Sequence, residues 1–189
     1  MNASALPFTP GEVIQTLPQA GFWGCAVVLT AKPRSSEFHP QFHVAITPIV
    51  FRHEFTSAEL DLATLSVLRF GRHVRVGKGE YVARGEVPCI GIYTAVTRGD
   101  VKSLGKVDPH GLYESPLTFD VGDGTKGAFP LCGPLHSSIG SEAVVAWRRV
   151  HDAAALEKDI LDARERYETF EQQRLEKTRD DRRRKRGSK

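Results

Sequence analysis

The sequence predicts an α+β protein built on a strongly bent, mostly antiparallel β-sheet (a partial barrel) with a short helix and a long C-terminal helix. Short runs of Val, Ile and aromatic residues alternate with Pro and Gly turns over residues 10–150. From Asp152 onward, apolar residues instead recur at steps of three and four among charged residues. We therefore expect a β-rich globular domain over residues 1–150 and a long charged helix with a basic, frayed end over residues 151–189.

The predicted strands follow from β-branched and aromatic runs bounded by turn residues. Val13–Leu17 and Phe22–Thr30 flank a Pro-Gln-Ala-Gly turn and form the first pair. Phe42–Phe51 is the third candidate, and its Pro48 favours an edge strand or a bulge over a central position, because proline cannot donate to the ladder. Further strand candidates lie at residues 74–76, 80–92, 117–121 and 128–131, the last two flanking the hairpin signal Gly122-Asp123-Gly124. Residues 97–110 are expected to form a loop.

Two segments show helix signals. Thr56 and Glu59 fit a capping box, so a short helix should follow them. Its buried face should carry Leu60, Ala63 and Leu68. Asp152 can cap the long helix, which could extend to about Arg179 before fraying. The apolar seam of that helix consists of Ala153, Leu156, Ile160, Ala163, Tyr167 and Phe170. Residues 143–150 are compatible with a last strand or with the lead-in to the helix.

Composition and charge limit the classes of function. The chain has 189 residues, of which 40% are hydrophobic and 26% charged, as in soluble globular proteins. Apolar runs fall short of the roughly 20 residues that span a bilayer, and the first ten residues lack the features of a signal peptide. The widely spaced Cys25, Cys89 and Cys132 form no CxxC pair, which favours a reduced, cytoplasmic protein. No membrane partner is expected.

Catalytic, cofactor-binding and metal-binding signatures are weak, so we expect a protein that is not an enzyme and needs no cofactor or metal. Residues 122–127 lack the spacing of a phosphate loop. His39 and His43 flank a proline and so lack the helical spacing of zinc-peptidase ligands. Cys132 has His136 four residues away, which leaves a cysteine-dependent hydrolase as a third hypothesis.

The basic C-terminus supports a second hypothesis, a nucleic-acid-binding β domain with a basic helical tail. The residues concerned are Arg182, Arg183, Arg184, Lys185 and Arg186. Contacts with phosphates would depend on salt, whereas a solvated helix end also accounts for such a run. The Tyr167 and Phe170 seam is compatible with packing inside the chain or with a homodimer through the C-terminal helix.

Four segments follow one another in a characteristic order. Gly11-Glu12-Val13-Ile14 precedes a second strand, Gly21–Leu29, that carries Gly before an aliphatic run. Tyr81–Pro88 follows, and Ala143–Trp147 then leads into a helix. Over about residues 10 to 160 this order resembles the immunity-26 family of bacterial polymorphic-toxin systems. The charged helix beyond Ile160 is not part of the family pattern.

The resemblance implies a non-enzymatic protein that binds and blocks a toxin made by the same cell, with no catalytic residues to carry over. We therefore expect a cytoplasmic immunity protein that neutralises a cognate bacterial toxin domain. Recognition would rest on aromatic or Arg anchors within a polar rim. The candidate anchors are Phe22, Trp23, Tyr81, Arg84 and Tyr93. Whether Phe22 and Trp23 point into the core or toward a partner is left open by the sequence.

Overall fold

The computed structural model describes residues 6–34, 39–76, 80–117, 119, 126–130 and 139–187, and the side chains of all of these except 72–76, 80–84, 126–130 and 180–187. The strands are β1 (Glu12–Gln19), β2 (Phe22–Lys32), β3 (Gln41–Phe51), β4 (Arg69–Val76), β5 (Glu80–Pro88), β6 (Ile90–Thr94), β7 (Ser103–Lys106) and β8 (Lys126–Pro130). The helical elements are the 3₁₀ turns η1 (Ser57–Glu59) and η2 (Leu62–Thr64) and the helices α1 (Pro109–Leu112), α2 (Ser141–His151) and α3 (Ala153–Gly187). The chain forms two compact units, Met1–Trp147 and Arg148–Lys189.

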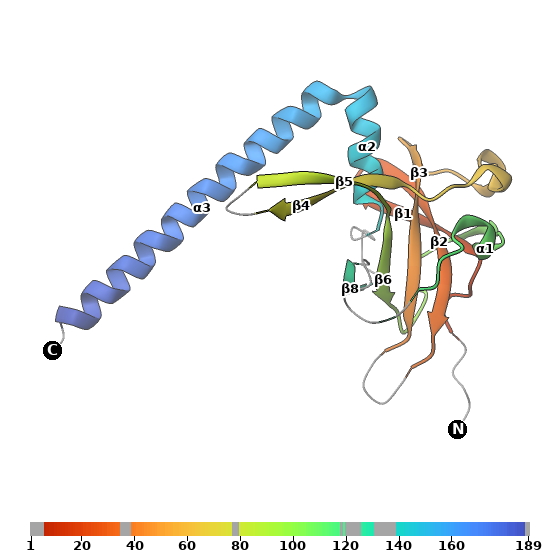
Figure 1. Ribbon diagram of the computed structural model, residues 1–189, viewed down its shortest axis with the longest axis horizontal. Helices are drawn as coiled ribbons and strands as arrows, with labels where there is room; N and C mark the ends of the chain where they lie inside the picture. Colours follow the sequence, from red (N-terminus) through yellow and green to blue (C-terminus); the bar gives the residue numbers. More distant parts are fainter. Residues whose placement is uncertain are drawn as a thin grey trace. The chain divides into compact units, whose positions relative to one another are not determined.

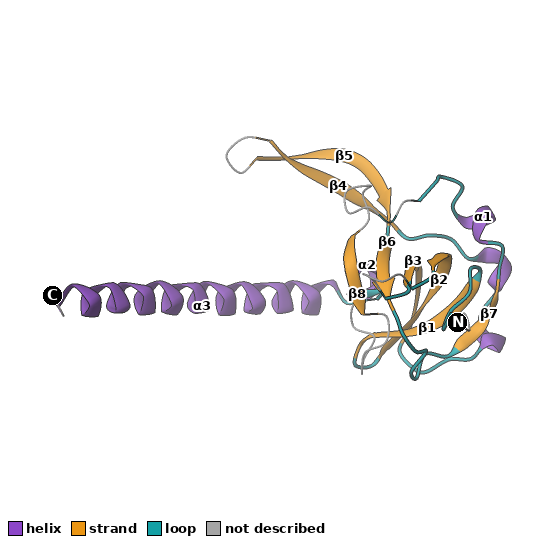
Figure 2. Cartoon of the chain, turned by 90° about the horizontal axis from the view of Figure 1, so that it is seen from below, coloured by secondary structure: helices purple, strands orange, loops and turns teal. Residues whose placement is uncertain are grey.

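The first unit is built on a six-stranded sheet in the order β7-β1-β2-β3-β6-β8, drawn in Figures 1 and 2. Neighbouring strands are antiparallel except β6 and β8, which run parallel. The edge strands β7 and β8 do not pair with each other in the described residues, so the sheet is open. Strands β4 and β5 form a separate antiparallel hairpin that extends beyond this sheet (Figure 2). The predicted α+β class with a mostly antiparallel sheet is confirmed.

Strand β3 shows how the sheet accommodates Pro48. It lies between β2 and β6, so it is not the edge strand that the proline favoured. Its pairing with β6 covers only Gln41 to Ala45, and the proline lies beyond that stretch. On the other side, the register with β2 shifts between Ile46 and Val50, which places Pro48 in a bulge. The predicted bulge is therefore confirmed, and the missing N–H removes no ladder hydrogen bond with β6.

The capping box after β3 forms as predicted, but the helix after it is shorter than expected. The backbone N–H of Thr56 donates to Glu59 at 2.9 Å, and the 3₁₀ turn η1 ends at that residue. Asp61 then accepts a hydrogen bond from the N–H of Ala63 and starts a second turn, η2. Two short turns in place of one α-helix leave Ala63 exposed, contrary to the prediction. The buried leucines of this segment are Leu60, Leu65 and Leu68.

Three other expectations are corrected or decided. The predicted loop over residues 97–110 contains β7, a four-residue edge strand that pairs with β1. The strand predicted at 128–131 exists as β8, but it joins β6 in parallel, a non-local pairing that a hairpin signal does not predict. The expected turn at residues 122–124 lies outside the described residues. Residues 143–150 belong to α2 and are not a strand.

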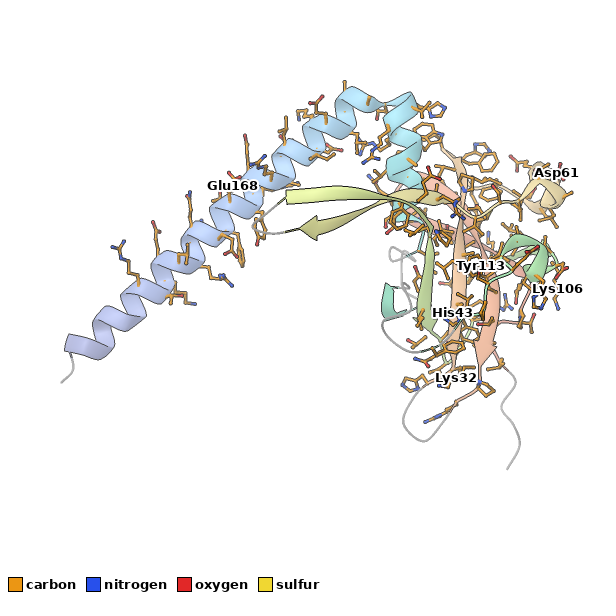
Figure 3. The ribbon with its side chains drawn as sticks, viewed as in Figure 1. Lys32, His43, Asp61, Lys106, Tyr113 and Glu168 are labelled. Carbon is orange, nitrogen blue, oxygen red and sulfur yellow. The ribbon has the colours of Figure 1, made fainter. Side chains whose placement is uncertain are left out.

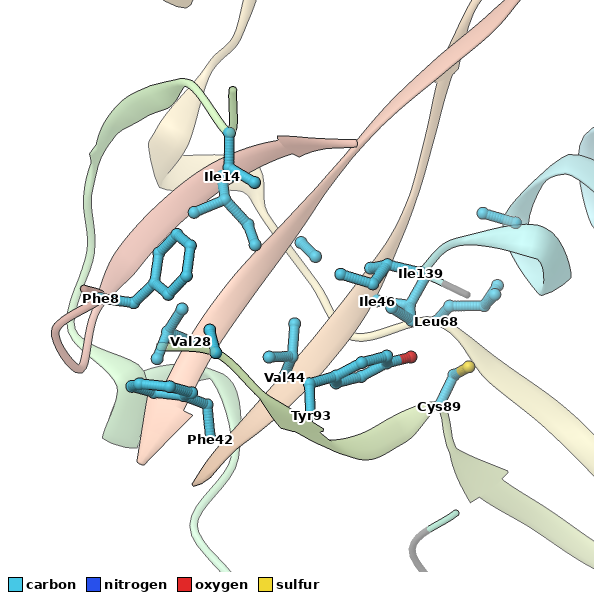
Figure 4. Packing of buried hydrophobic residues seen from close by; sticks show 14 residues of the cluster. Phe8, Ile14, Val28, Phe42, Val44, Ile46, Leu68, Cys89, Tyr93 and Ile139 are labelled. Atoms are coloured by element: carbon cyan, nitrogen blue, oxygen red, sulfur yellow. The ribbon is translucent and has the colours of Figure 1, made fainter. Parts of the chain in front are cut away.

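Both faces of the main sheet are buried, which explains the continuous apolar run of β2. Successive residues of β2 alternate between two core clusters, because side chains of a strand point to opposite faces. The first cluster, shown in Figure 4, contains Phe8, Ile14, Val28, Phe42, Val44, Ile46, Tyr93 and Ile139 among others. The second contains Val13, Cys25, Val27, Leu29, Ala45, Phe55, Leu60, Leu65, Ile90 and Leu104. Leu60 and Leu65, which directly follow the two 3₁₀ turns, and Leu104 of β7 close this second face.

Gly11 and Glu12 fix the start of β1 to its surroundings. Gly11 has a φ of 82°, and a Cβ at this position would lie 2.3 Å from the carbonyl oxygen of Val107. The Glu12 carboxylate is buried, with Nη1 of Arg98 at 2.6 Å and the N–H of Thr9 at 3.2 Å. Burial alone would raise the pKa of Glu12, but the hydrogen bonds and charge of Arg98 and the Thr9 N–H hold it below its usual value. This Gly-Glu pair therefore has a structural role.

The second unit begins with Arg148 and is dominated by α3. The backbone carbonyl of Asp152 accepts a hydrogen bond from the N–H of Leu156, which confirms Asp152 as the residue that precedes the helix. Arg148 contacts two carboxylates at this junction, with 2.8 Å to Asp159 and 3.6 Å to Asp152. Helix α3 continues to Gly187, beyond the predicted end. Among the described residues, none of the helices combines the length and the apolar character needed to cross a membrane.

Candidate functional site

The structure separates the five predicted anchor residues. Phe22 and Tyr93 are buried, so neither offers a side chain to a partner in this conformation. Tyr93 belongs to the first core cluster, and its burial raises the pKa of its hydroxyl group. The side chains of Tyr81 and Arg84, both on β5, lie outside the described residues. Trp23 is half-buried and is the anchor candidate that reaches the surface in the described part of the chain.

Phe22 packs inward because it meets an aromatic residue of α2. Its ring lies edge-on to that of Trp147, with 5.7 Å between ring centroids. The exposed guanidinium of Arg52 covers the Phe22 ring at 4.0 Å from its centroid. These contacts attach α2 to the start of β2. The first of the two adjacent aromatic residues is therefore a packing residue.

Trp23 faces the other way and lines a surface cavity of about 290 Å³. The other lining residues are Gln15, Thr16, Leu17, Glu54, Asp100 and Lys102. One side of the indole packs against the second core cluster, which restricts its motion. Gln15 is buried beside it and donates a hydrogen bond of 2.7 Å to the carbonyl oxygen of Phe55. The wall of the cavity is therefore held by the fold itself.

Charged side chains surround the Trp23 cavity. Lys102 and Glu54 form an exposed ion pair, and Asp100 lies on the same cavity. A second cavity, of about 430 Å³, adjoins the first and shares Glu54 and Lys102 with it. Its remaining lining residues are Phe55, Thr56, Ser57, Ser103 and Leu104. We call the surface formed by the two cavities the Trp23 surface.

The chemistry of the Trp23 surface suits the binding of a side chain from a partner. An indole face attracts a cation, and the carboxylates of Asp100 and Glu54 favour the same charge. Lys102 balances one of these carboxylates. Sequence patterns identified Trp23 but missed Glu54, Asp100 and Lys102. Glu54 lies in the loop after β3, whereas Asp100 and Lys102 lie in the loop before β7, and no motif links the two loops.

The described thiols are poorly suited to nucleophilic catalysis. Cys25 is buried in β2, and burial raises the pKa of its thiol to about 11 despite a contact of 3.0 Å with the Thr47 hydroxyl. Cys89 is buried as well. Cys132 and His136, the pair behind the hydrolase hypothesis, lie outside the described residues. That hypothesis therefore stays a prediction.

The two histidines of the FHPQFH segment occupy different environments. His39 is exposed, whereas His43 is buried in β3 with its Nδ1 atom 2.6 Å from the Thr30 hydroxyl. The ring of His43 also packs on Phe119 at 4.2 Å between centroids. Figure 3 shows His43 near Lys32, whose ammonium lies 5.6 Å from the same phenyl ring. Within the described part of the chain, no group of three His, Cys, Asp or Glu residues could hold a metal ion.

The basic run at the C-terminus belongs to α3 by its backbone, but the side chains of residues 182–186 lie outside the described residues. Nucleic-acid binding therefore stays a prediction. Comparison of the chain with protein-family models, with curated proteins and with solved structures found no match.

Proposed function

We propose that the chain is a non-enzymatic immunity protein that binds and neutralises a cognate bacterial toxin domain through the Trp23 surface. The observation that carries this proposal is the setting of Trp23, a half-buried indole with one side against the core and an open cavity beside it. Interface hot spots are enriched in tryptophan, and a side chain that is already held loses little freedom on binding.

The charges around the indole indicate the chemistry of the contact. Asp100 and Glu54 place two carboxylates on a cavity that holds one ammonium group, from Lys102. A lysine or arginine side chain of the toxin domain would find a cation–π contact with Trp23 and a carboxylate within the same cavity. Binding that covers a toxin's own cationic residues would block a toxin that acts on an anionic substrate.

The test is co-expression of the chain with the toxin domain encoded by the neighbouring gene. We expect a stable complex and rescue of growth. Trp23→Ala should weaken the complex by about 30-fold or more, in the range of an interface hot spot. Phe70→Ala, at an exposed aromatic residue of β4, is the matched control and should leave the affinity within about threefold.

A second variant keeps the test valid if Trp23→Ala fails to fold. Asp100→Arg changes an exposed charge, so it should preserve the fold and still weaken binding by about tenfold, mainly through slower association at low salt. No complex and no rescue of growth would overturn the proposed function. A complex that tolerates both variants would retain the function and overturn the Trp23 surface as its site. Salt-dependent binding of single-stranded DNA that is lost on truncation after Asp181 would instead favour the nucleic-acid hypothesis.

A further inference from the structure

Helix α3 carries an apolar stripe on an otherwise charged surface. Ile160, Tyr167 and Phe170 are each more than half exposed. With Ala163 they follow the alternating three- and four-residue steps of heptad positions a and d. Figure 3 shows side chains projecting from α3 on several sides, and Glu168 is the labelled residue of this helix. Two aromatic rings and an isoleucine on one stripe are more than a solvated helix needs for its own stability.

The residues that flank the stripe are complementary to those of an identical, parallel helix. With Ile160 and Tyr167 at position a, the g positions hold Asp159 and Arg166, and the e positions hold Arg164 and Glu171. In a parallel pair, each g residue meets the e residue five positions later on its partner. The contacts would join Asp159 to Arg164 and Arg166 to Glu171, and both combine opposite charges.

The ion pairs that Arg164 and Glu171 form within one chain do not prevent these contacts between two helices. Arg164 contacts Glu168 at 3.0 Å, and Glu171 contacts Arg174 at 2.9 Å. These two pairs are exposed and contribute little, so their loss costs little when the charges find partners on a second helix. Asp159 differs, because it also contacts the nearly buried Arg148 at 2.8 Å, so the contact of Arg166 with Glu171 carries the charge match. After Phe170 the next a and d positions are Arg174 and Lys177, which would face their own copies and repel. The complementary stretch therefore ends at Phe170.

We propose that α3 pairs in parallel with α3 of a second copy of this chain, through a short seam of Ile160, Ala163, Tyr167 and Phe170. The seam spans about two heptads, so the dimer should be of moderate affinity, about micromolar. The pairing would bring two Trp23 surfaces into one assembly. It does not depend on the function proposed for that surface.

The first test compares the seam with an equally exposed part of the same helix in the full-length chain. Sedimentation equilibrium should show a monomer–dimer equilibrium over a roughly hundredfold range of protein concentration centred on about 1 µM. The double variant Tyr167→Glu with Phe170→Glu should weaken dimerisation by more than about 100-fold. The control, Leu161→Glu with Leu175→Glu, changes two exposed residues outside the seam and should shift the equilibrium by less than about threefold. Far-UV circular dichroism checks that both variants keep their helix.

The second test addresses the parallel orientation. Arg166→Glu and Glu171→Arg should each weaken the dimer several-fold, because each places like charges across the seam. The two substitutions together restore opposite charges and should restore the affinity. A chain that stays monomeric up to about 100 µM, or a dimer that resists the seam variant, would overturn the pairing. A double charge variant as weak as the single ones would overturn the parallel arrangement.

Discussion

Replacing Arg98 with alanine would leave the Glu12 carboxylate buried without its cation. The Glu12 side chain is 4% exposed and Arg98 is 38% exposed, and their closest atoms are 2.6 Å apart. Removal of one partner of a fully buried pair costs about 3–5 kcal/mol. Because water reaches part of Arg98 and the Thr9 N–H still binds the carboxylate, we expect a loss of about 2–3 kcal/mol of unfolding free energy at neutral pH.

The loss should depend on pH in a defined direction. In the native protein the pKa of Glu12 is held below its usual value, so its contribution to stability is present above that value and is lost as the pH falls through the lowered pKa. Without Arg98, we expect burial, the largest influence on Glu12, to outweigh the hydrogen bonds of Thr9 and Ser103 and to raise the pKa of Glu12. The variant can then protonate the carboxyl group, so the difference from the native protein should narrow by about 1 kcal/mol between neutral pH and about pH 4.

The assay is urea unfolding at the two pH values, with Lys102→Ala as control. Lys102 pairs with Glu54 at the surface, where both partners are more than half exposed, so this loss should stay below about 1 kcal/mol. Arg98 also lies 4.8 Å from the centroid of the Phe8 ring, a contact that adds about 0.5–1 kcal/mol at every pH. A cost for Arg98→Ala that is the same at both pH values would refute the ion-pair account.

Two further results are expected from the core. Gly11→Ala should cost about 3 kcal/mol or more in thermal unfolding, because its Cβ would meet backbone and its φ is positive. Gly21→Ala, with a similar φ but open space around it, should cost only about 1–2 kcal/mol, and equal losses would show that the steric contact is unimportant. Cys25 should resist alkylation in the native protein at about pH 8 and react in denaturant, because burial raises the pKa of its thiol to about 11. Peptide mass spectrometry measures the modification. A modified Cys25 in the native protein would contradict its burial.

Local patterns predicted the parts of the fold that local chemistry determines. The β1–β2 hairpin forms around Gly21, the capping box forms at Thr56, and α3 begins after Asp152, each from signals within a few residues. The four residues of β7 carry almost no strand signal and pair only because β1 offers them an edge. The parallel pairing of β8 likewise depends on β6, more than thirty residues earlier in the sequence. Non-local pairing is the physical reason that the strand β7 and the parallel partner of β8 were not predicted.

The Trp23 surface likewise has features that the local sequence predicts and features that depend on distant segments. An aromatic pair at the start of a strand predicted an anchor, and strand alternation then required its two members to face opposite sides. The sequence left open which of Phe22 and Trp23 is the outward one. That choice depends on Trp147, which packs on Phe22 from α2. The charged neighbours of Trp23 depend on how three distant segments meet, which no local pattern contains.

The residues behind the family resemblance and the residues of the Trp23 surface have different physical roles. Gly11 supplies a positive φ beside a close carbonyl, and Glu12 a buried ion pair, so any chain with this β1 geometry needs them whatever it binds. Glu54, Asp100 and Lys102 line an open cavity and can change at little cost to the fold. If the chain is an immunity protein, the charges of Glu54, Asp100 and Lys102, which we call the rim charges, should therefore determine which toxin it binds. Gly11 and Glu12 should determine only the fold. Exchange of the rim charges should alter which partner binds and leave the unfolding free energy within about 1 kcal/mol, which thermal unfolding of the same variants measures directly.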